Sequence, residues 1–576
     1  MDQQSGKKSR EGRACPIFLP QGGIVMIDVT QSPYDAKGDG VTDDTAAIQQ
    51  ALNDAAAFGG GVVYVPNGTY NISASLVVQD YITLRGDGMD LTVLNLKGNS
   101  NTVGIKTPDK TIIALTQQND FLPGYTVDQV NNTLATGDCV VYKSAKRFTE
   151  EWDGGTAIRG YYTNGELFRL QDASATTLYF EESPHMDFPH SDTKGIDAFT
   201  PTRNVVIEKL TITRDGVTKS GTDIAGNVGV LIQFCDGAVV REVKSVNTNY
   251  AGVKIDRSID VTVEDFESVG FSAEDGYLYG VLVADGAKNV HLANIRSKKN
   301  RHGIAGGNSG IAVPVNVYAD GIFISETVNN PNGTETHSLD CHGATMNFHY
   351  RNVSVDKGLS ISGQGHVVEK VKSSAGHFLM YEGGVDMIFR DIHFTECRGF
   401  FSSKAVKQVL IENVTLNYSR YNRNTTHSSS EDVHFRGFRL INKDFLSAGS
   451  DTEADQTVIQ TGQGYIGLLL RKGFTIRDSY IEGFPEGLYV TGANVKVDHV
   501  QIQNCGWLSR FTSQECGLHV HNGADCAVIR DVLIGFNKSG MTPQRPIRFD
   551  FFDTIDGASN GYRIFLEGFR HLPEKS

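Results

Sequence analysis

The stretch that decides the fold lies near the N-terminus and reads DAKGDGVTDDTAAIQQALNDAAAFGGGVVYVP over residues 35–66. Thr42 is the predicted N-cap of a short helix, and the two aspartates after it suit the positive end of the helix dipole. Three glycines, 59–61, then end the helix and allow a turn into a first strand. We expect the helix to cover the open, apolar end of a stack of strands. The apolar face that would do so consists of Ile48, Ala51, Leu52 and Ala55.

One eight-residue pattern recurs along most of the remaining chain: apolar, any, apolar, any, any, apolar, any, apolar. Its fifth position is often Asp or Asn, and we interpret Asn294, Asn352, Asp391 and Asn413 as turn formers at that position. The repeats are VVIEKLTI (205–212), VVREVKSV (239–246), VTVEDFES (261–268), VHLANIRS (290–297), VYADGIFI (317–324), FHYRNVSV (348–355), VVEKVKSS (367–374), MIFRDIHF (387–394), VLIENVTL (409–416), VHFRGFRL (433–440), FTIRDSYI (474–481), VKVDHVQI (495–502) and AVIRDVLI (527–534).

This pattern predicts strand–bend–strand units that stack on one another. Alternation of apolar and polar residues indicates strands with one buried face, and the flip after the fourth position indicates a bend between two strands. A unit that cannot bury its own apolar face must stack on its neighbours. Without helices between strands, the prediction is an all-β parallel β-helix whose coils rise by roughly 4.8 Å each. An antiparallel sandwich is the rival fold, but it needs tight hairpin turns such as Asn-Gly, which are sparse here.

Composition excludes several classes of protein. The 576 residues carry a net charge of −14, so nucleic acid is not an expected partner, because phosphate binding needs clustered Lys and Arg. No apolar run is long enough for a membrane span, and the first 23 residues lack the apolar core of a secretory signal. The eight cysteines form no CxxC pair, and we expect buried free thiols. These features predict a protein made in the cytoplasm that does not insert into membranes.

The motif DAKGDGVTDDTAAIQQAL followed by GGGVVYVPNGTYNIS resembles the start of the pectate-lyase-like superfamily of right-handed β-helices. A segment with GDCVVYKS (137–144) and YYTNGELFRLQDASATTLYF (161–180) breaks the repeat and is similar to a β-rich insert of phage tail proteins. With its polar, basic N-terminus, the chain resembles the short-tether tailspike capsule depolymerases of podoviruses that infect Klebsiella. The resemblance implies a homotrimer of the virion tail that cleaves bacterial capsular polysaccharide outside the host cell.

The same reading divides the chain into five parts. They are a tether that joins another tail or spike protein (1–28), the helix cap and first coils (29–99), an inserted β-rich lobe (100–200), the central β-helix with the catalytic face (201–416), and C-terminal coils with long polar loops that serve glycan binding or trimerisation (417–576). The predicted loops are residues 417–432 and 443–466.

Candidate site residues lie on the strand that precedes each repeat. Alternation predicts that Val253, Ile255, Leu339, Cys341, Phe378 and Met380 point inward. The outward set is then Lys254, Asp256, Asp340, His342, Leu379 and Tyr381. Neighbouring segments add Arg301 and His302 in NRHGIAGG, His337 in THSLDCHG, and His377 and Glu382 in HFLMYEGG. A similar Arg-His and then Asp-x-His-Gly succession occurs in phage tail β-helix proteins.

Coil spacing selects one pair of carboxylates for glycoside hydrolysis. Asp256 and Asp340 are three coils apart, roughly 14 Å, too far to act together. Asp340 and Glu382 are two coils apart, roughly 10 Å, which side-chain reach can bring into the range of an inverting pair. We predict Asp340 and Glu382 as the acid and base, with His342 and Arg301 orienting groups or stabilising charge. The predicted substrate-binding residues are Tyr381, which would stack on a sugar ring, and His302, Lys254, Asp256, His337 and His377.

Three alternatives stay open. A polysaccharide lyase would use a base and a cation on a uronate, with Lys254, Arg301, His302, His342 and Tyr381 as candidates. A non-catalytic tail fibre would only bind glycan, and a solenoid spacer would show a featureless outer face. His302, His337 and His377 also suit a structural role, in which each hydrogen-bonds backbone groups at a corner of a coil.

We expect no metal and no cofactor. The Asp and two His of THSLDCHG lack the spacing of a zinc motif, and no dinucleotide-binding glycine motif occurs. Neither the Tyr-x-x-Asp-x-His motif of mannuronan epimerases nor the paired aspartates of polygalacturonases is present, so the sequence does not support an activity on plant-wall pectin.

Overall fold

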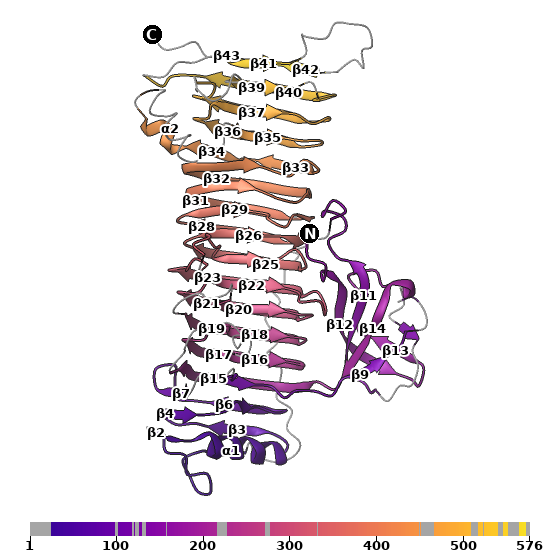
Figure 1. Ribbon diagram of the computed structural model, residues 1–576, viewed down its shortest axis with the longest axis vertical. Coiled ribbons are helices and arrows are strands. Elements are labelled where there is room, and N and C mark those ends of the chain that lie inside the picture. Colours follow the sequence, from indigo (N-terminus) through magenta and orange to yellow (C-terminus); the bar gives the residue numbers. More distant parts are fainter. Residues whose placement is uncertain are drawn as a thin grey trace, which may run out of the picture.

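The computed structural model describes residues 25–571, except 98–101, 118–119, 121–125, 129–133, 157, 216–226, 271–276, 331, 449, 451–465, 508–515, 522, 540–544, 551–563 and 569. Most of the predicted tether and of the second predicted loop lies outside these residues. The described chain forms an elongated stack with a β-rich lobe along one side (Figure 1). The prediction of an all-β, right-handed parallel β-helix is confirmed.

Two ladders of parallel strands build the middle of the stack. One contains β15 (Thr202–Arg214), β17 (Cys235–Val246), β19 (Ile259–Val269), β21 (Lys288–Lys298), β23 (Val315–Ser325), β25 (Met346–Val355), β28 (Val367–Ser373), β31 (Ile388–Phe401) and β32 (Val406–Thr425). The other contains β16 (Val228–Gln233), β18 (Ala251–Asp256), β20 (Tyr279–Ala284), β22 (His302–Gly307), β24 (Leu339–Cys341), β26 (Gly358–Ile361) and β29 (Gly376–Leu379). Each coil therefore sits on the previous one in register.

The bend of each repeat is a single residue with positive φ, which Asn, Asp and Gly tolerate best. Asn294 has φ 53° and Asn352 has φ 52°, so the turn-former interpretation of the fifth position is confirmed. Their amides also donate to the coil before, Asn294 to Asp265 at 3.1 Å and Asn352 to Asp320 at 2.6 Å. In VVREVKSV and VVEKVKSS the bend instead falls on the fourth residue, Glu242 or Lys370, because the buried apolar residue follows one position earlier.

Helix α1 (Thr45–Ala57) covers the N-terminal end of the stack, as predicted. Its predicted apolar face is fully buried, from Ile48 to Ala55. The predicted N-cap is wrong: Asp44 precedes the helix, while Thr42 lies in β2 (Asp39–Asp43) with its hydroxyl on Asp39. The Asp44 carboxylate accepts backbone N–H groups of the preceding turn rather than capping the helix. At Gly60, φ is +121° and a Cβ would lie 2.6 Å from a carbonyl oxygen, so the turn into the next strand needs glycine.

The first coils are short. They consist of β1 (Met26–Asp28), β2, β3 (Gly61–Tyr64), β4 (Gly68–Ile72), β5 (Leu76–Val77), β6 (Ile82–Arg85), β7 (Thr92–Leu96) and β8 (Ile105–Lys106). β6 and β7 pair directly with β15, so the stack continues from residue 96 to residue 202 across the inserted segment.

The inserted segment forms a separate antiparallel sheet. Its order is β10 (Thr126–Asp128), β13 (Thr177–Phe180), β12 (Thr163–Ala173), β11 (Cys139–Arg147), β14 (Thr193–Phe199) and β9 (Ile113–Leu115). Trp152, Tyr162 and Phe168 of this lobe share one buried apolar cluster with Val315 and Met346 of the stack. The lobe is thus anchored on the outer face of the middle coils (Figure 1).

The polar segment 417–432 is mostly strand rather than the predicted loop. β32 continues to residue 425, and β33 (Glu431–Arg436) begins soon after. Tyr418 and Asn424 are buried, and the Asn424 amide donates to the Gly467 carbonyl of the next coil. Asn417 and Asn424 are accommodated in a strand because their side-chain amides donate to backbone carbonyls of neighbouring coils. The second predicted loop begins with β34 (Arg439–Asn442) and α2 (Lys443–Ser447).

The C-terminal coils have two parallel ladders. One contains β35 (Ile466–Leu470), β37 (Glu486–Val490), β39 (Cys516–Val520) and β41 (Ile547–Phe549). The other contains β36 (Thr475–Glu482), β38 (Lys496–Gln503), β40 (Ala527–Gly535), β42 (Ile564–Glu567) and β43 (Arg570–His571). Within the described residues, no helix is long and apolar enough to cross a membrane.

Candidate active site

The predicted alternation around the candidate site matches the structure. All six residues expected to point inward belong to the main apolar core. Asp340 is flanked on β24 by two of them, Leu339 and Cys341, so its side chain projects from the outer face. It is nevertheless only 7% exposed, because side chains of neighbouring coils surround it. The site is therefore a covered part of the outer face and not an open one.

Two imidazoles contact the Asp340 carboxylate. Nε2 of His302, on β22, lies 3.3 Å from Oδ2, and Nε2 of His342 lies 3.5 Å from the same oxygen. Burial favours the protonated acid, but the neighbouring His342, His302, His337 and Arg301 outweigh burial and hold the pKa of Asp340 well below its usual range. Asp340 is an anion at neutral pH.

His342 lies between two carboxylates. Its Nδ1 is 3.7 Å from Oε2 of Glu382, on the opposite side of the ring from Asp340. Burial lowers the pKa of His342, but Asp340 and Glu382 outweigh burial and raise it above its ordinary value of 6.5. The ring packs against Gly307, where a Cβ would lie 3.3 Å from the imidazole. Its side chain is 26% exposed, so the ring can still reach a ligand.

Glu382 is held by the lobe as well as by the stack. Its carboxylate accepts the Gly343 N–H at 2.7 Å, the Tyr162 hydroxyl at 3.2 Å and the Arg159 Nε–H at 3.1 Å. Burial raises the pKa of Glu382, but His342, the Gly343 N–H and Arg159 outweigh burial and lower it. The indole of Trp152 donates to the Glu382 carbonyl at 3.1 Å. The lobe therefore completes one wall of the site.

Within the part of the chain that the structure describes, Arg301 has no carboxylate partner. Its guanidinium donates to the Tyr279 hydroxyl at 2.9 Å, the Tyr277 carbonyl at 3.0 Å and the Asn330 amide oxygen at 3.5 Å, all neutral acceptors. Among the residues that the structure describes, no carboxylate lies within 4.0 Å of it. The Tyr279 ring stacks on His302, with centroids 5.8 Å apart. Arg301 is thus fixed beside the Asp340 cluster with its charge available.

Except for His337, whose carbonyl oxygen contacts Nδ1 of His302, the other predicted residues lie outside this cluster. Lys254 and Asp256 pair with each other at 3.2 Å on β18, three coils from Asp340. His377 lies 3.6 Å from Glu335, and its ring contacts that of His337 at 5.9 Å. Tyr381 is half exposed. The structure thus brings together Asp340, His342, Glu382, His302 and Arg301, whereas Lys254 and Asp256 form a separate pair.

The residues that the lobe contributes were not predicted from the sequence. Tyr162 and Arg159 lie 220 and 223 positions before Glu382, and no repeat links the lobe to a particular coil. The one signal is the run RGYY at 159–162, which gathers a cation and two aromatic rings inside the insert. Such a cluster is typical of a polar binding surface.

A cavity of about 350 Å³ lies next to Trp152, between the lobe and the stack. Its lining includes Glu150, Lys407, Ser429, Glu431 and Lys472. The backbone of the same lobe segment accepts a hydrogen bond across this junction, where the Ala405 N–H donates to the Trp152 carbonyl. A polar hollow therefore adjoins the Asp340 cluster on its C-terminal side.

Fold and site together define a class of protein, the right-handed parallel β-helix, and comparisons with known proteins show what the chain is similar to. Residues 27–158 match the family model described as "Rhamnogalacturonase A/epimerase, pectate lyase-like". Two solved tailspikes share the fold over most of both chains. Gp49 from Pseudomonas phage LKA1 is 15% identical with a TM-score of 0.55, covering 88% of this chain and 84% of that one. Gp61 from Pseudomonas phage phi297 is 15% identical with a TM-score of 0.52, covering 94% and 82%.

Curated relatives match a shorter part of the chain. Mannuronan C5-epimerase AlgE4 of Azotobacter vinelandii is 42% identical over 82 residues, which are 13% of this chain and 15% of that protein. Alginate lyase 7 of the same organism is 43% identical over 70 residues, 11% of this chain and 8% of that protein. The chain therefore spans less than one sixth of the length of these two relatives.

Proposed function

We propose that the chain is a phage tailspike that binds and cleaves a bacterial capsular polysaccharide, with its reaction centre at Asp340, His342, Glu382 and Arg301. One observation carries the proposal: an imidazole with a raised pKa lies, partly exposed, between two ionised carboxylates on the face that the lobe covers. The tailspike fold and the named polysaccharide-modifying relatives support it. A spacer would not need such a cluster.

The geometry supports β-elimination on a uronate best. A general base works best when its pKa lies near the working pH, and the raised pKa of His342 suits this role. Arg301 would pair with the uronate carboxylate and stabilise the negative charge that develops when the adjacent C–H proton moves to His342. The C–O bond to the leaving sugar then breaks, a C=C bond forms, and the leaving oxygen takes a proton from water, while His342 later releases its proton to solvent. Asp340 and Glu382 orient His342 and increase its basicity.

Hydrolysis is the second candidate, because Asp340 and Glu382 do lie on two sides of one reactive position. A glycosidase needs one carboxylic acid with a raised pKa, whereas both of these pKa values are lowered. In a hydrolytic reaction the imidazolium of His342 would therefore donate the proton, and one carboxylate would activate water. The predicted acid role of either carboxylate has no support from its environment.

Substrate contacts extend beyond the centre. The exposed Tyr381 ring would stack on a sugar, and His302, His337 and His377 would line the approach to Asp340. The cavity beside Trp152 offers space for further sugar units. We also propose that three chains associate side by side and that the N-terminal residues attach them to another tail protein.

The test is to incubate the full-length protein with a panel of neutral and uronate-containing capsular polysaccharides. Reducing ends and the ultraviolet absorbance of a conjugated unsaturated uronate are followed together. New ends with absorbance mean elimination, and new ends without it mean hydrolysis. Binding without new ends on every polysaccharide contradicts the enzyme proposal and leaves a glycan-binding fibre.

A matched pair of variants tests whether His342 belongs to the proposed reaction centre. His342→Gln removes the proposed base, while His393→Gln changes an exposed histidine of β31 that lies outside the site. Only the first should lose activity. Arg301→Gln should cost about 10- to 100-fold in kcat/KM on a uronate polymer, the effect of losing a charged hydrogen bond. An unchanged kcat/KM in Arg301→Gln would contradict the role of the guanidinium.

A further inference from the structure

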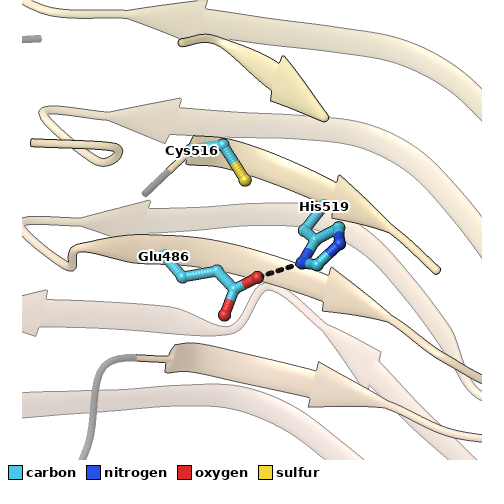
Figure 2. Close-up of side chains that lie close together, drawn as sticks. All are labelled: Glu486, Cys516 and His519. Atoms are coloured by element: carbon cyan, nitrogen blue, oxygen red, sulfur yellow. Dashed lines mark hydrogen bonds and ion pairs between the residues drawn. The ribbon is translucent and has the colours of Figure 1, made fainter. Parts of the chain in front are cut away.

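A second cluster of ligand-type side chains lies in the C-terminal coils, far along the stack from Asp340. Glu486 begins β37, and Cys516 begins the adjacent β39, where the two residues are partners in the ladder. His519 lies three residues further along β39. The carboxylate oxygen, the Cys516 sulfur and Nδ1 of His519 all lie within 4.8 Å of one another, and all three residues are buried. Figure 2 shows the three side chains converging on one space between the two strands.

The hydrogen bonding of a neutral His519 favours a cation beside Nδ1. Nε2 lies 2.9 Å from Oδ2 of Asp550, and Nδ1 contacts Oε1 of Glu486. A neutral imidazole has one N–H donor, so it can donate to only one of two ionised carboxylates. If Nε2–H donates to Asp550, the lone pair of Nδ1 faces an oxygen that also carries lone pairs. A cation between Nδ1 and Glu486 turns this repulsion into two bonds.

The Asp550 contact is also the arrangement that metal-binding histidines commonly have. Such a histidine usually donates its other N–H to a carboxylate, which fixes the ring and increases its basicity. The Tyr489 ring stacks on His519 with centroids 4.3 Å apart and an angle of 14°, which further restricts the imidazole. The ring is thus oriented before any ligand binds.

The donor set selects the class of ion. One sulfur, one imidazole nitrogen and one carboxylate oxygen are ligands of Zn²⁺ and similar transition metals, whereas Ca²⁺ and Mg²⁺ prefer oxygen alone. Binding releases the thiol proton of Cys516, so the ion's two charges balance one thiolate and one carboxylate. Cys516 and His519 read Cys-x-x-His, and the third ligand comes from the neighbouring coil.

We propose that Glu486, Cys516 and His519 bind one Zn²⁺-class ion per chain, with Asp550 as the positioning residue for His519. The ion would join β37 to β39 and act as a staple between two of the last coils. This differs from the sequence-based expectation of no metal, which considered only motifs within one segment. The site is separate from the proposed reaction centre, so the two proposals succeed or fail independently.

The test uses the full-length protein purified without chelators and then loaded with Zn²⁺ or Co²⁺. Elemental analysis should find about one ion per chain. The Co²⁺ form should show the near-ultraviolet charge-transfer band of a thiolate ligand, which requires no mutation. Removing the ion with a chelator should lower the midpoint of thermal unfolding without changing activity on polysaccharide at lower temperature.

Variants assign the ligands. Cys516→Ser should abolish the charge-transfer band, and Asp550→Asn should weaken Zn²⁺ binding by about 10- to 100-fold. Cys526→Ser, a partly exposed cysteine of the same region, is the matched control and should change neither. A wild-type protein that is folded but binds no stoichiometric ion overturns the proposal. Ion binding that persists unchanged in Cys516→Ser, or that is lost in His499→Gln at the exposed Asp498–His499–Asp531 group, overturns it as well.

Discussion

Two histidines of this molecule, His342 and His519, each lie between two carboxylates, yet their surroundings differ. His342 is 26% exposed, and its nitrogens are 3.5 Å and 3.7 Å from Asp340 and Glu382. The His519 side chain is fully buried, 2.9 Å from Asp550, in direct contact with Glu486, and covered by Tyr489. One ring has loose partners and access to solvent, whereas the other has close partners and none.

The comparison shows that a His–carboxylate cluster is not by itself a mark of catalysis. A base must exchange a proton with a ligand, which needs access and partners that do not hold the ring too tightly. A structural or metal-binding histidine needs the opposite, a fixed ring with every nitrogen engaged. We therefore expect His342 to control activity and His519 to control stability.

The largest effect should come from His342→Gln. Loss of a general base typically costs about 10²- to 10⁴-fold, and we expect kcat to fall within this range on any polysaccharide that the wild type cleaves. The thermal unfolding midpoint should stay close to that of the wild type, because the ring is partly exposed. Steady-state kinetics and a thermal melting curve on the same preparation check the fall in kcat and the unchanged unfolding midpoint. Retained activity in His342→Gln would contradict the assignment of a catalytic role to His342 and a structural role to His519.

His519→Gln should give the reverse result. It leaves the buried Glu486 carboxylate without its imidazole partner, and an unpaired buried charge costs about 3–5 kcal/mol. Urea unfolding should shift to a correspondingly lower midpoint, while kcat at low temperature stays unchanged. If this variant loses activity in proportion to its folded fraction, the prediction stands; a specific loss of kcat in fully folded protein contradicts it.

Acid stability should depend on His337 as well. Burial lowers its pKa to about 4, below its ordinary 6.5. Between these two pKa values the unfolded chain binds a proton at His337 and the folded chain does not. The free energy of unfolding therefore falls as pH drops from 6.5 to about 4, by roughly 3 kcal/mol in all. His337→Gln should flatten this decline in melting temperature between pH 7 and 4. An equally steep decline would show that His337 does not limit acid stability.

The smallest predicted effect is a shift in the pH–rate profile. For elimination, kcat/KM should rise with pH through a pKa above 6.5, as His342 loses its proton. For hydrolysis with His342 as the acid, it should fall through the same pKa. Asp340→Asn removes one of the anions that raise this pKa, so the limb should move to lower pH by a fraction of a unit to about one unit. If the pKa in the pH–rate profile does not change in Asp340→Asn, that pKa belongs to a group other than His342.

The sequence revealed the coils better than the contacts between them. The apolar positions of α1 and the inward residues of β24 and β29 follow from periodicity, because one buried face imposes it along each element. The bend at Glu242 and the strand through Tyr418 were missed, since a polar side chain that bonds between coils leaves no periodic signal. The proximity of Asp340, His342 and Glu382 was predicted from the coil register, which sets the distance along the stack.

The remaining site residues depend on where the lobe sits. Arg159 and Tyr162 reach Glu382 from another sheet, and no pattern in the chain specifies that docking. The proposed metal ligands show the same limit, because Glu486 joins Cys516 only through the stacking of one coil on the next. Patterns within a segment predict which face is buried, but they do not predict which segments meet there.

The position of the lobe in the chain has a consequence for synthesis. The ribosome completes the lobe at Phe199, whereas Glu382, which the lobe will contact, is made about 180 residues later, roughly 10–40 s at ordinary elongation rates. During that interval Trp152 and Tyr162 have no strands to cover them, although both end up buried. A truncated or stalled chain would therefore expose apolar side chains that promote aggregation. Newly synthesised copies of this protein are prone to aggregate until the later coils have been translated.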